Sequence, residues 1–173
     1  RMRLFSMRFD SKDLAVVVPT KDRPQQIREL LESLAAQSRK PGSIIIVDGG
    51  QSVEPVIAPF RDRLDVLHVP CHPPGQVRQR LKGLEAVDDS TPLVGFFDDD
   101  IVFEPDAIER MLDFWNRAPA ETGGVAFNLT NVPPQHPSKL RALLGMSGKP
   151  GELLKSGFNI SVANQRESIK TQW

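Results

Sequence analysis

The sequence contains very little cysteine and no excess of charge of either sign. Cys71 is the single cysteine among 173 residues, so neither an internal disulfide nor a cysteine-rich zinc site is possible. Lys and Arg number 22, as do Asp and Glu, and this balance argues against a general nucleic-acid binder, which would be basic. No apolar run approaches the roughly 18 residues that cross a bilayer. Any chemistry must therefore come from carboxylates, arginines, lysines, histidines and backbone groups.

What the sequence does contain is the composition of a globular domain. Hydrophobic residues make up 39% and charged residues 25%, which excludes wholesale disorder. The first residues are basic and apolar but include no sustained hydrophobic stretch and no cleavage site, so we predict no secretory signal. The chain stops at Trp173 inside what is predicted as a continuing segment, so we expect it to be part of a longer protein.

Short apolar runs alternate along the chain with segments of helical periodicity. The predicted strands are 14–18, 44–47, 64–69, 93–97 and 125–129. The predicted helices begin at Pro24 and Pro105, with a short one around 56–60 and another around 77–84. In the helix around 77–84 the apolar residues that define the predicted buried stripe are Val77, Leu81 and Leu84.

Strands that are apolar throughout and alternate with helices are typical of an α/β fold with a mostly parallel sheet flanked by helices. We expect an N-terminal tail or edge segment over 1–13, an α/β domain over 14–131 and a loop-rich region over 132–173. Such sheets bind ligands beyond the carboxyl ends of their strands. The segments to examine are therefore 20–23, 48–50, 71–75 and 98–100.

Three consecutive aspartates follow a Phe-Phe strand end, where partial desolvation adds to their mutual repulsion. A divalent cation relieves that repulsion, and Mg²⁺ and Mn²⁺ prefer oxygen ligands. Side chains alternate in an extended segment, so Asp98 and Asp100 would point the same way and form the natural pair. From Glu85 to Asp113 the chain has ten acidic residues and one basic residue. The alternative is a solvated acidic turn before a helix N-terminus, where Asp is favoured.

Weaker signals come from the other strand ends and from one arginine. Asp48 precedes two glycines that let a ligand approach the backbone, and its carboxylate can accept from a nucleobase or a ribose; alternatively it forms a turn. Asp22 can cap the following helix, while Lys21 and Arg23 can serve as counter-charges for a diphosphate. Arg80 lies about 60° from the predicted apolar stripe of its helix, so it either snorkels or points at an anion.

Together these motifs resemble family 2 glycosyltransferases of the GT-A fold. The resemblance covers roughly 14–130 and rests on four segments in the family's order and spacing: Val-Val-Val-Pro-Thr-Lys-Asp-Arg over 16–23, Ile-Ile-Ile-Val-Asp-Gly-Gly over 44–50, Arg80 with Gly83-Leu84, and Phe-Phe-Asp-Asp-Asp over 96–100 before Pro105-Asp106. It implies the nucleotide-sugar-binding half of an enzyme, truncated before the acceptor-binding half. The implied reaction is an inverting transfer from a UDP-, GDP- or dTDP-linked sugar.

The resemblance also implies roles for individual residues. Asp98 and Asp100 would form a DxD pair that binds Mn²⁺ or Mg²⁺, with Asp100 as the chief ligand. Asp48 would contact the base. The full set of residues expected to bind the nucleotide is Pro19, Thr20, Asp22, Arg23, Asp48, Arg80, Asp98 and Asp99. The acids after Phe127 are Glu152 and Glu167, in no family motif, so the catalytic base is expected outside this chain.

Two other functional classes fit parts of the pattern. A non-catalytic nucleotide-binding module would keep the site without the transfer. A nucleotidyltransferase on a similar scaffold predicts a Gly-rich loop after the first strand, where no glycine occurs before Gly42. For the glycosyltransferase we expect a carbohydrate or lipid-linked acceptor, as in polysaccharide biosynthesis, and a cytoplasmic location peripheral to a membrane. No nucleic-acid partner is expected, and the sequence leaves the oligomeric state open.

Overall fold

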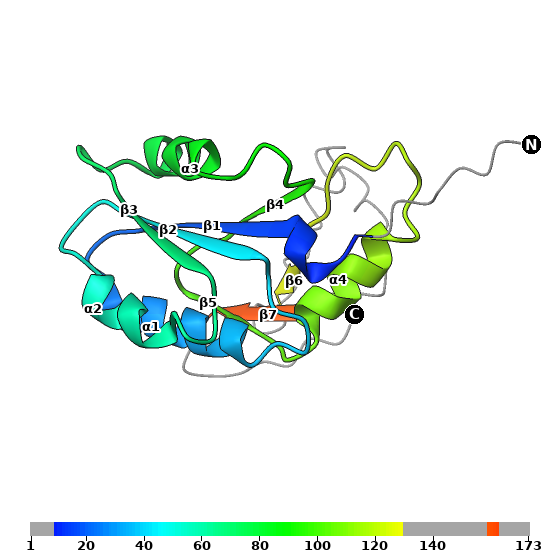
Figure 1. Ribbon diagram of the computed structural model, residues 1–173, viewed down its shortest axis with the longest axis horizontal. Helices are drawn as coiled ribbons and strands as arrows, with labels where there is room; N and C mark the ends of the chain where they lie inside the picture. The colour runs from blue at the N-terminus through cyan, green and yellow to red at the C-terminus, as the bar shows by residue number, and fades with distance from the viewer. Residues whose placement is uncertain (1–8, 130–158, 163–173) are drawn as a thin grey trace, which may run out of the picture.

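A four-stranded parallel sheet forms the centre of the molecule in a computed structural model that describes residues 9–129 and 159–162 (Figure 1). Its strands, in the spatial order β3-β2-β1-β4, are β1 (Leu14–Thr20), β2 (Ser43–Asp48), β3 (Val66–Pro70) and β4 (Leu93–Phe96). Thr20 is in register with Asp48, which in turn is in register with Pro70. The carboxyl ends of the strands therefore meet at one edge, and the predicted α/β fold with a mostly parallel sheet is confirmed.

Helices cover both faces of this sheet, which explains why its strands are apolar throughout. Val16 and Ile46 belong to the core beneath α1 (Pro24–Ala35) and α2 (Glu54–Ile57). Val17 and Val47 belong to the core on the opposite face, beneath α3 (Gln76–Glu85). Figure 1 shows α1 and α2 below the sheet and α3 above it.

The helices on the first face form where their apolar spacing predicts them. Pro24 occupies the first turn of α1, where the N–H that proline lacks would have no partner in any case. The buried apolar side chains of α1 are Ile27, Leu30, Leu31 and Leu34. Those of α4 (Ala107–Trp115) are Ala107, Ile108, Met111 and Leu112. The short helix α2 continues into the 3₁₀-helix η2 (Ala58–Phe60), as the sequence predicts for this region.

The predicted buried stripe of α3 is wrong. The three residues assigned to it are exposed, by 72%, 57% and 45% for Val77, Leu81 and Leu84 respectively. The buried residues of α3 are instead Gln79 and Gly83. Gly83 lies so close to the side chains of Val17 and Val47 that a Cβ atom would collide with them. The helix therefore approaches the sheet through its smallest residue and turns its apolar stripe outward.

A second, three-stranded sheet contains β5 (Ile101–Phe103), β7 (Asn159–Val162) and β6 (Asn128–Leu129), in that order. Strand β7 is antiparallel to β5 and parallel to β6. The strand predicted over 125–129 is thus reduced to its last two residues and lies outside the main sheet. Strands β5 and β7 were not predicted. Three residues are too few for β5 to show a period, and β7 lies in a stretch whose sequence has no clear period.

The ends of the chain are described only in part. The 3₁₀-helix η1 (Ser11–Asp13) leads directly into β1, within the segment predicted as a tail or edge. Most of the region predicted as loop-rich over 132–173, including Glu152 and Glu167, lies outside the described residues. In the described part of the chain, no helix combines the length and the apolar character needed to span a membrane.

Candidate functional site

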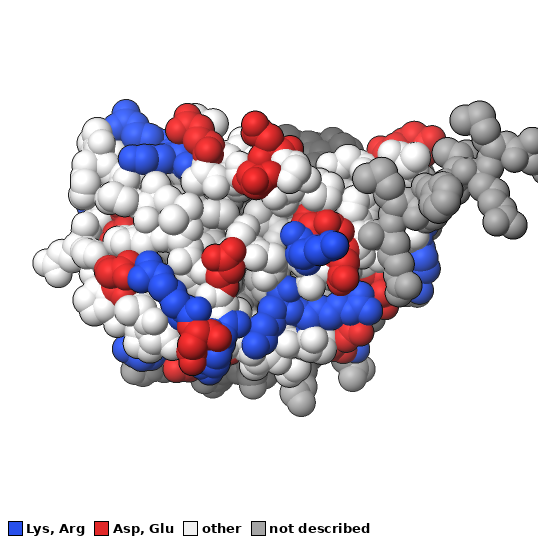
Figure 2. Space-filling view, in the orientation of Figure 1, with Lys and Arg blue, Asp and Glu red and all other residues white. Residues whose placement is uncertain are grey.

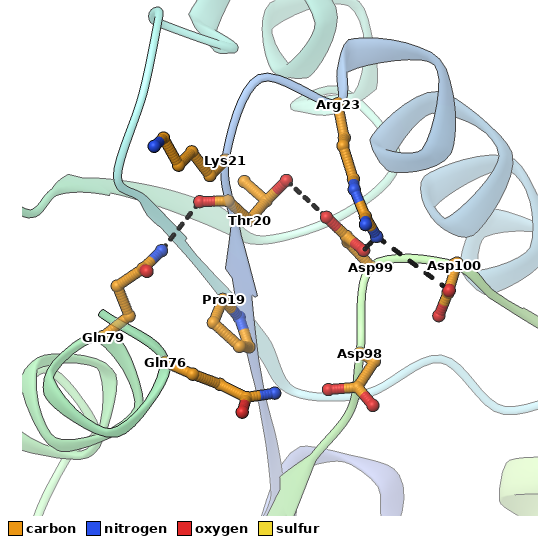
Figure 3. Close-up of a pocket in the computed structure, with 9 residues that line it drawn as sticks. All are labelled: Pro19, Thr20, Lys21, Arg23, Gln76, Gln79, Asp98, Asp99 and Asp100. Atoms are coloured by element: carbon orange, nitrogen blue, oxygen red, sulfur yellow. Dashed lines mark hydrogen bonds and ion pairs between the residues drawn. The ribbon is translucent and has the colours of Figure 1, made fainter. Parts of the chain in front are cut away.

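A pocket of about 450 Å³ opens at the carboxyl ends of β1 and β4, beside the start of α3 (Figure 3). Its lining residues are Pro19, Thr20, Lys21, Arg23, Gln76, Gln79, Asp98, Asp99 and Asp100. The structure therefore brings together the aspartate triplet and most of the residues predicted after β1. Asp22, Asp48 and Arg80 belong to the predicted site but do not line this pocket. The position is the one that a parallel sheet favours for a ligand.

Asp99 is the buried member of the triplet, with 6% of its surface exposed. Its carboxylate accepts hydrogen bonds from the Thr20 hydroxyl at 2.8 Å and from the Arg23 guanidinium at 2.9 Å. The hydrogen bond to Asp99 and the charge of that carboxylate raise the pKa of Arg23 above its usual value. Asp99 thus joins the loop after β1 to the turn after β4 and fixes two walls of the pocket (Figure 3).

Asp98 and Asp100 are more exposed than Asp99, with 55% and 35% of their side chains accessible. Asp98 accepts a hydrogen bond from Arg80 at 2.8 Å, and a carboxylate oxygen of Asp100 lies 3.9 Å from a guanidinium nitrogen of Arg23. Two arginines therefore offset the repulsion among the three carboxylates, a role for which the sequence suggested a metal ion. Of the two predicted alternatives for Arg80, contact with an anion is the observed one, and the anion is Asp98.

The protein donors available to a metal ion at this pocket are few. Across the described residues, no group of three or more His, Cys, Asp or Glu side chains is arranged to hold an ion. Mg²⁺ is usually bound by one or two carboxylates, with phosphate oxygens and water completing its shell. Asp98 and Asp100 line the same pocket. They therefore fit an ion that also has phosphate ligands, and they do not form an all-protein site.

Asp22 fastens the loop after β1 to the loop after β2. Its carboxylate accepts a hydrogen bond from the backbone N–H of Gln51 at 2.8 Å, and its own backbone has a left-handed φ of 55°. The N-cap of α1 is Arg23, with no side-chain capping bond, so the alternative in which Asp22 caps the helix is not what the structure shows. Gly50 lies against Asp22 so closely that a side chain at position 50 would collide with it.

Asp48 ends β2 and is 2% exposed. Its carboxylate accepts hydrogen bonds from the backbone N–H groups of Gly50 at 2.9 Å and Val53 at 3.0 Å. The turn-forming alternative is therefore what the structure shows. His68, for which the sequence suggested no role, lies between Asp48 and Glu54. Its Nε2 is 3.3 Å from the Asp48 carboxylate, and its Nδ1 is 3.3 Å from the Glu54 carboxylate.

Gln79 is the main residue of the site that the sequence analysis missed. Its amide nitrogen donates to the carbonyl oxygens of Thr20 at 2.7 Å and Val47 at 2.8 Å, and its Oε1 accepts from the N–H of Gly75 at 3.2 Å. It therefore ties the carboxyl ends of β1 and β2 to the start of α3. No signal in the sequence marked it, because a polar residue opposite an apolar stripe is what any surface helix contains.

Known proteins share this architecture. The family model described as glycosyl transferase family 2 matches residues 15–164. No curated protein matches the sequence. Among solved structures, S. aureus TarS has a TM-score of 0.55 at 19% identity, over 69% of this chain and 24% of that chain. S. aureus TarS 1-349 in complex with UDP-GlcNAc has a TM-score of 0.53 at 20% identity, over 69% of this chain and 38% of that chain. At this identity the likeness shows a shared fold.

Proposed function

Because the chain belongs to glycosyl transferase family 2 and has the GT-A type of fold, we propose that it binds a nucleotide-sugar donor in the pocket at the carboxyl ends of β1 and β4, for transfer of the sugar. The observation that carries this proposal is that one pocket joins Asp98 and Asp100 to Lys21 and Arg23. Cationic side chains suit a diphosphate, and the acidic pair suits a cation bound to it. The TarS structures with UDP and UDP-GlcNAc support a donor of this kind.

A divalent ion, Mn²⁺ or Mg²⁺, is part of the proposal. When bound, such an ion would stabilise negative charge on the departing nucleoside diphosphate. We propose Asp100 as its chief ligand, because the nearest guanidinium nitrogen of Arg23 is 3.9 Å away. Asp98 is the second ligand, although Arg80 already donates to it at 2.8 Å. Arg80 therefore acts on the site by orienting Asp98.

The nucleoside is proposed to lie against Pro19 and Thr20, the last two residues of β1, which line the pocket. Asp22 and Asp48 contribute indirectly in this proposal, since both carboxylates accept hydrogen bonds from backbone N–H groups of the loop over 49–53. Their role would be to fix that loop for recognition of the base. Lys21, which also lines the pocket, is proposed to join Arg23 in neutralising the diphosphate.

The transfer itself rests on the family alone. The chain spans 24% of TarS and about two fifths of the shorter TarS 1-349 chains, so the activity of the whole protein is a proposal. We propose an inverting transfer in which a carboxylate outside this chain deprotonates the acceptor. The proposed acceptor is a carbohydrate or a lipid-linked molecule at the cytoplasmic side of a membrane.

Isothermal titration calorimetry with UDP, GDP and dTDP, each with Mn²⁺ and with EDTA, tests the donor site. We expect one of the three to bind with an affinity that Mn²⁺ raises, and Asp100→Asn to remove most of the Mn²⁺ effect. Asp89→Asn is the matched control, because Asp89 is an exposed carboxylate of the same acidic stretch and does not line the pocket. If Asp100→Asn binds nucleotide and Mn²⁺ as the parent chain does, the assignment is wrong.

The arginine partners of the triplet favour one alternative, a module that binds a nucleotide without a metal ion and without catalysis. Arg23 and Arg80 already neutralise much of the acidic charge. In that case EDTA would leave the affinity for the nucleotide unchanged, and no nucleotide sugar would be hydrolysed even at high protein concentration. Slow hydrolysis of a nucleotide sugar that depends on Asp100 would favour the glycosyltransferase.

A further inference from the structure

The side of the sheet covered by α3 carries all the exposed large apolar side chains of the described residues: Leu67, Val77, Leu81, Leu84 and Phe96. Leu67 and Phe96 are in register with Ile45 and Val17, which belong to the core beneath α3. The opposite side, covered by α1, α2 and α4, leaves no large apolar side chain exposed in the described part of the chain. One helix is therefore too little to cover its side of a four-stranded sheet.

The apolar residues of α3 form a continuous stripe that points away from the sheet. At 100° per residue, Val77, Leu81 and Leu84 lie within about 60° of one another around the helix axis. Gln79 and Gly83 occupy the buried side. A surface helix normally turns its apolar stripe inward, so the reversed orientation of α3 leaves an exposed apolar surface in the described part of the chain.

The charges beside the stripe indicate what covers it. Arg78 and Glu85 are seven residues apart, so they lie two turns from each other on the same flank, and both are exposed. Within the described residues the Glu85 carboxylate has no ion-pair partner. On the other flank, Arg80 is engaged by Asp98. Figure 2 shows basic side chains at one end of the α3 edge and acidic side chains beside them.

We propose that a second copy of this chain packs on this surface, with the two α3 helices antiparallel about a two-fold axis near Leu81. In an antiparallel two-fold pair, each flank of one helix lies beside the same flank of the other helix, and the two run in opposite directions. Arg78 then faces Glu85 of the partner subunit, and the reciprocal pair forms as well. Val77 packs against Leu84 of the partner subunit, with the Leu81 side chains at the centre.

The other arrangements match the charges less well. A parallel pair would bring the flank of Arg78 beside the flank that carries Arg80, which places like charges together. An anionic lipid surface would attract Arg78 but repel Glu85 and the exposed carboxylates of Asp88 and Asp89 beyond the end of α3. The antiparallel second copy is the arrangement that pairs opposite charges at both ends of the stripe.

Sedimentation velocity on the full chain tests the proposal over about 1 µM to about 1 mM protein. We expect a monomer–dimer equilibrium centred at about 10–100 µM, because the proposed contact is built around a single helix from each subunit. Leu81→Glu should leave the fold unchanged by circular dichroism and abolish the dimer, because it buries a charge at the two-fold axis. A chain that stays monomeric throughout this range, or a dimer that Leu81→Glu leaves intact, overturns the proposal.

Charge exchange tests the antiparallel geometry. Arg78→Glu and Glu85→Arg should each weaken the dimer about tenfold, since each places like charges together at both ends. An equimolar mixture of the two variants should dimerise as the parent does. Arg28→Glu, the same change at an exposed position of α1, should have no effect. If the mixture does not dimerise as the parent chain does, the antiparallel pair is overturned. If the chain is instead monomeric and binds anionic vesicles through Leu81, the surface is assigned to lipid.

Discussion

Replacing Gly83 by alanine tests how closely α3 is held on the sheet. A Cβ atom at this position would collide with a methyl group of Val17 and would lie 3.0 Å from a methyl group of Val47. Both valines are fully buried in the central strands. Because they are β-branched, their χ1 angles are restricted and neither side chain can turn aside. The helix would therefore have to move away from the sheet.

Two opposing effects set the size of the change. Overpacking a well-filled core costs about 1–3 kcal/mol. Exchanging glycine for alanine inside a helix gains about 1 kcal/mol. Two contacts become too short at once, and neither partner can yield, so we place the cost in the upper half of its range. The expected net loss in the free energy of unfolding is about 1–2 kcal/mol.

Urea unfolding followed by tryptophan fluorescence measures this loss, with the slope m unchanged because the same surface is exposed on unfolding. Gly124→Ala is a control, since a Cβ at that position meets nothing within 4 Å. Adding Val17→Ala to Gly83→Ala makes room for the new methyl group. The double variant should therefore be about 1 kcal/mol more stable than the sum of the single changes predicts. A Gly83→Ala variant that is more stable than the parent chain, or strict additivity with Val17→Ala, refutes the close packing.

Two further predictions concern charged pairs. Asp99→Asn keeps an acceptor for Thr20 but removes the charge that pairs with Arg23. We therefore expect the free energy of unfolding, measured with urea, to fall by about 1–2 kcal/mol. A decrease below about 0.5 kcal/mol would contradict the role of Asp99 in joining the two loops. The hydrogen bond from Arg61 lowers the pKa of Glu54 from its usual 4.5, and the stabilisation from this pair is therefore present above that pH and lost as the pH falls through the folded-state pKa. Glu54→Gln should therefore make the decline in the free energy of unfolding below about pH 5 shallower. If this free energy falls with pH equally steeply in the variant and in the parent chain, the pair contributes nothing.

The parts of the fold that follow from one simple rule were predicted correctly. The central strands are apolar on both faces because helices bury both faces, so runs such as 14–18 and 44–47 identify them without any knowledge of the partner. The helix α1 follows the same logic, since its apolar side chains at helical spacing are the ones that pack on the sheet. The pocket position then follows from the parallel order, which places the residues after β1 and β4 at one edge.

The rest depended on contacts that no local pattern records. Asp22 and Asp48 look alike in the sequence, as single aspartates after a strand. Only the three-dimensional structure shows that each holds a backbone N–H of the loop over 49–53. The buried position of Asp99 between Thr20 and Arg23 also depends on a long-range pairing. Its two neighbours in the triplet differ from it in exposure although all three have the same side chain.

The orientation of α3 links the pocket to the outer surface. Gln79 and Gly83 are four residues apart, so they share one side of the helix, where the amide reaches the strand ends and the glycine permits close contact with the valines. With that side fixed on the sheet, the apolar residues can only point outward. The inward-facing pair Gln79 and Gly83 thus determines the position of both the donor site and the proposed dimer surface, which use different side chains. A monomeric chain would therefore leave the donor proposal standing, and loss of the Mn²⁺ effect in Asp100→Asn would leave the dimer unchanged.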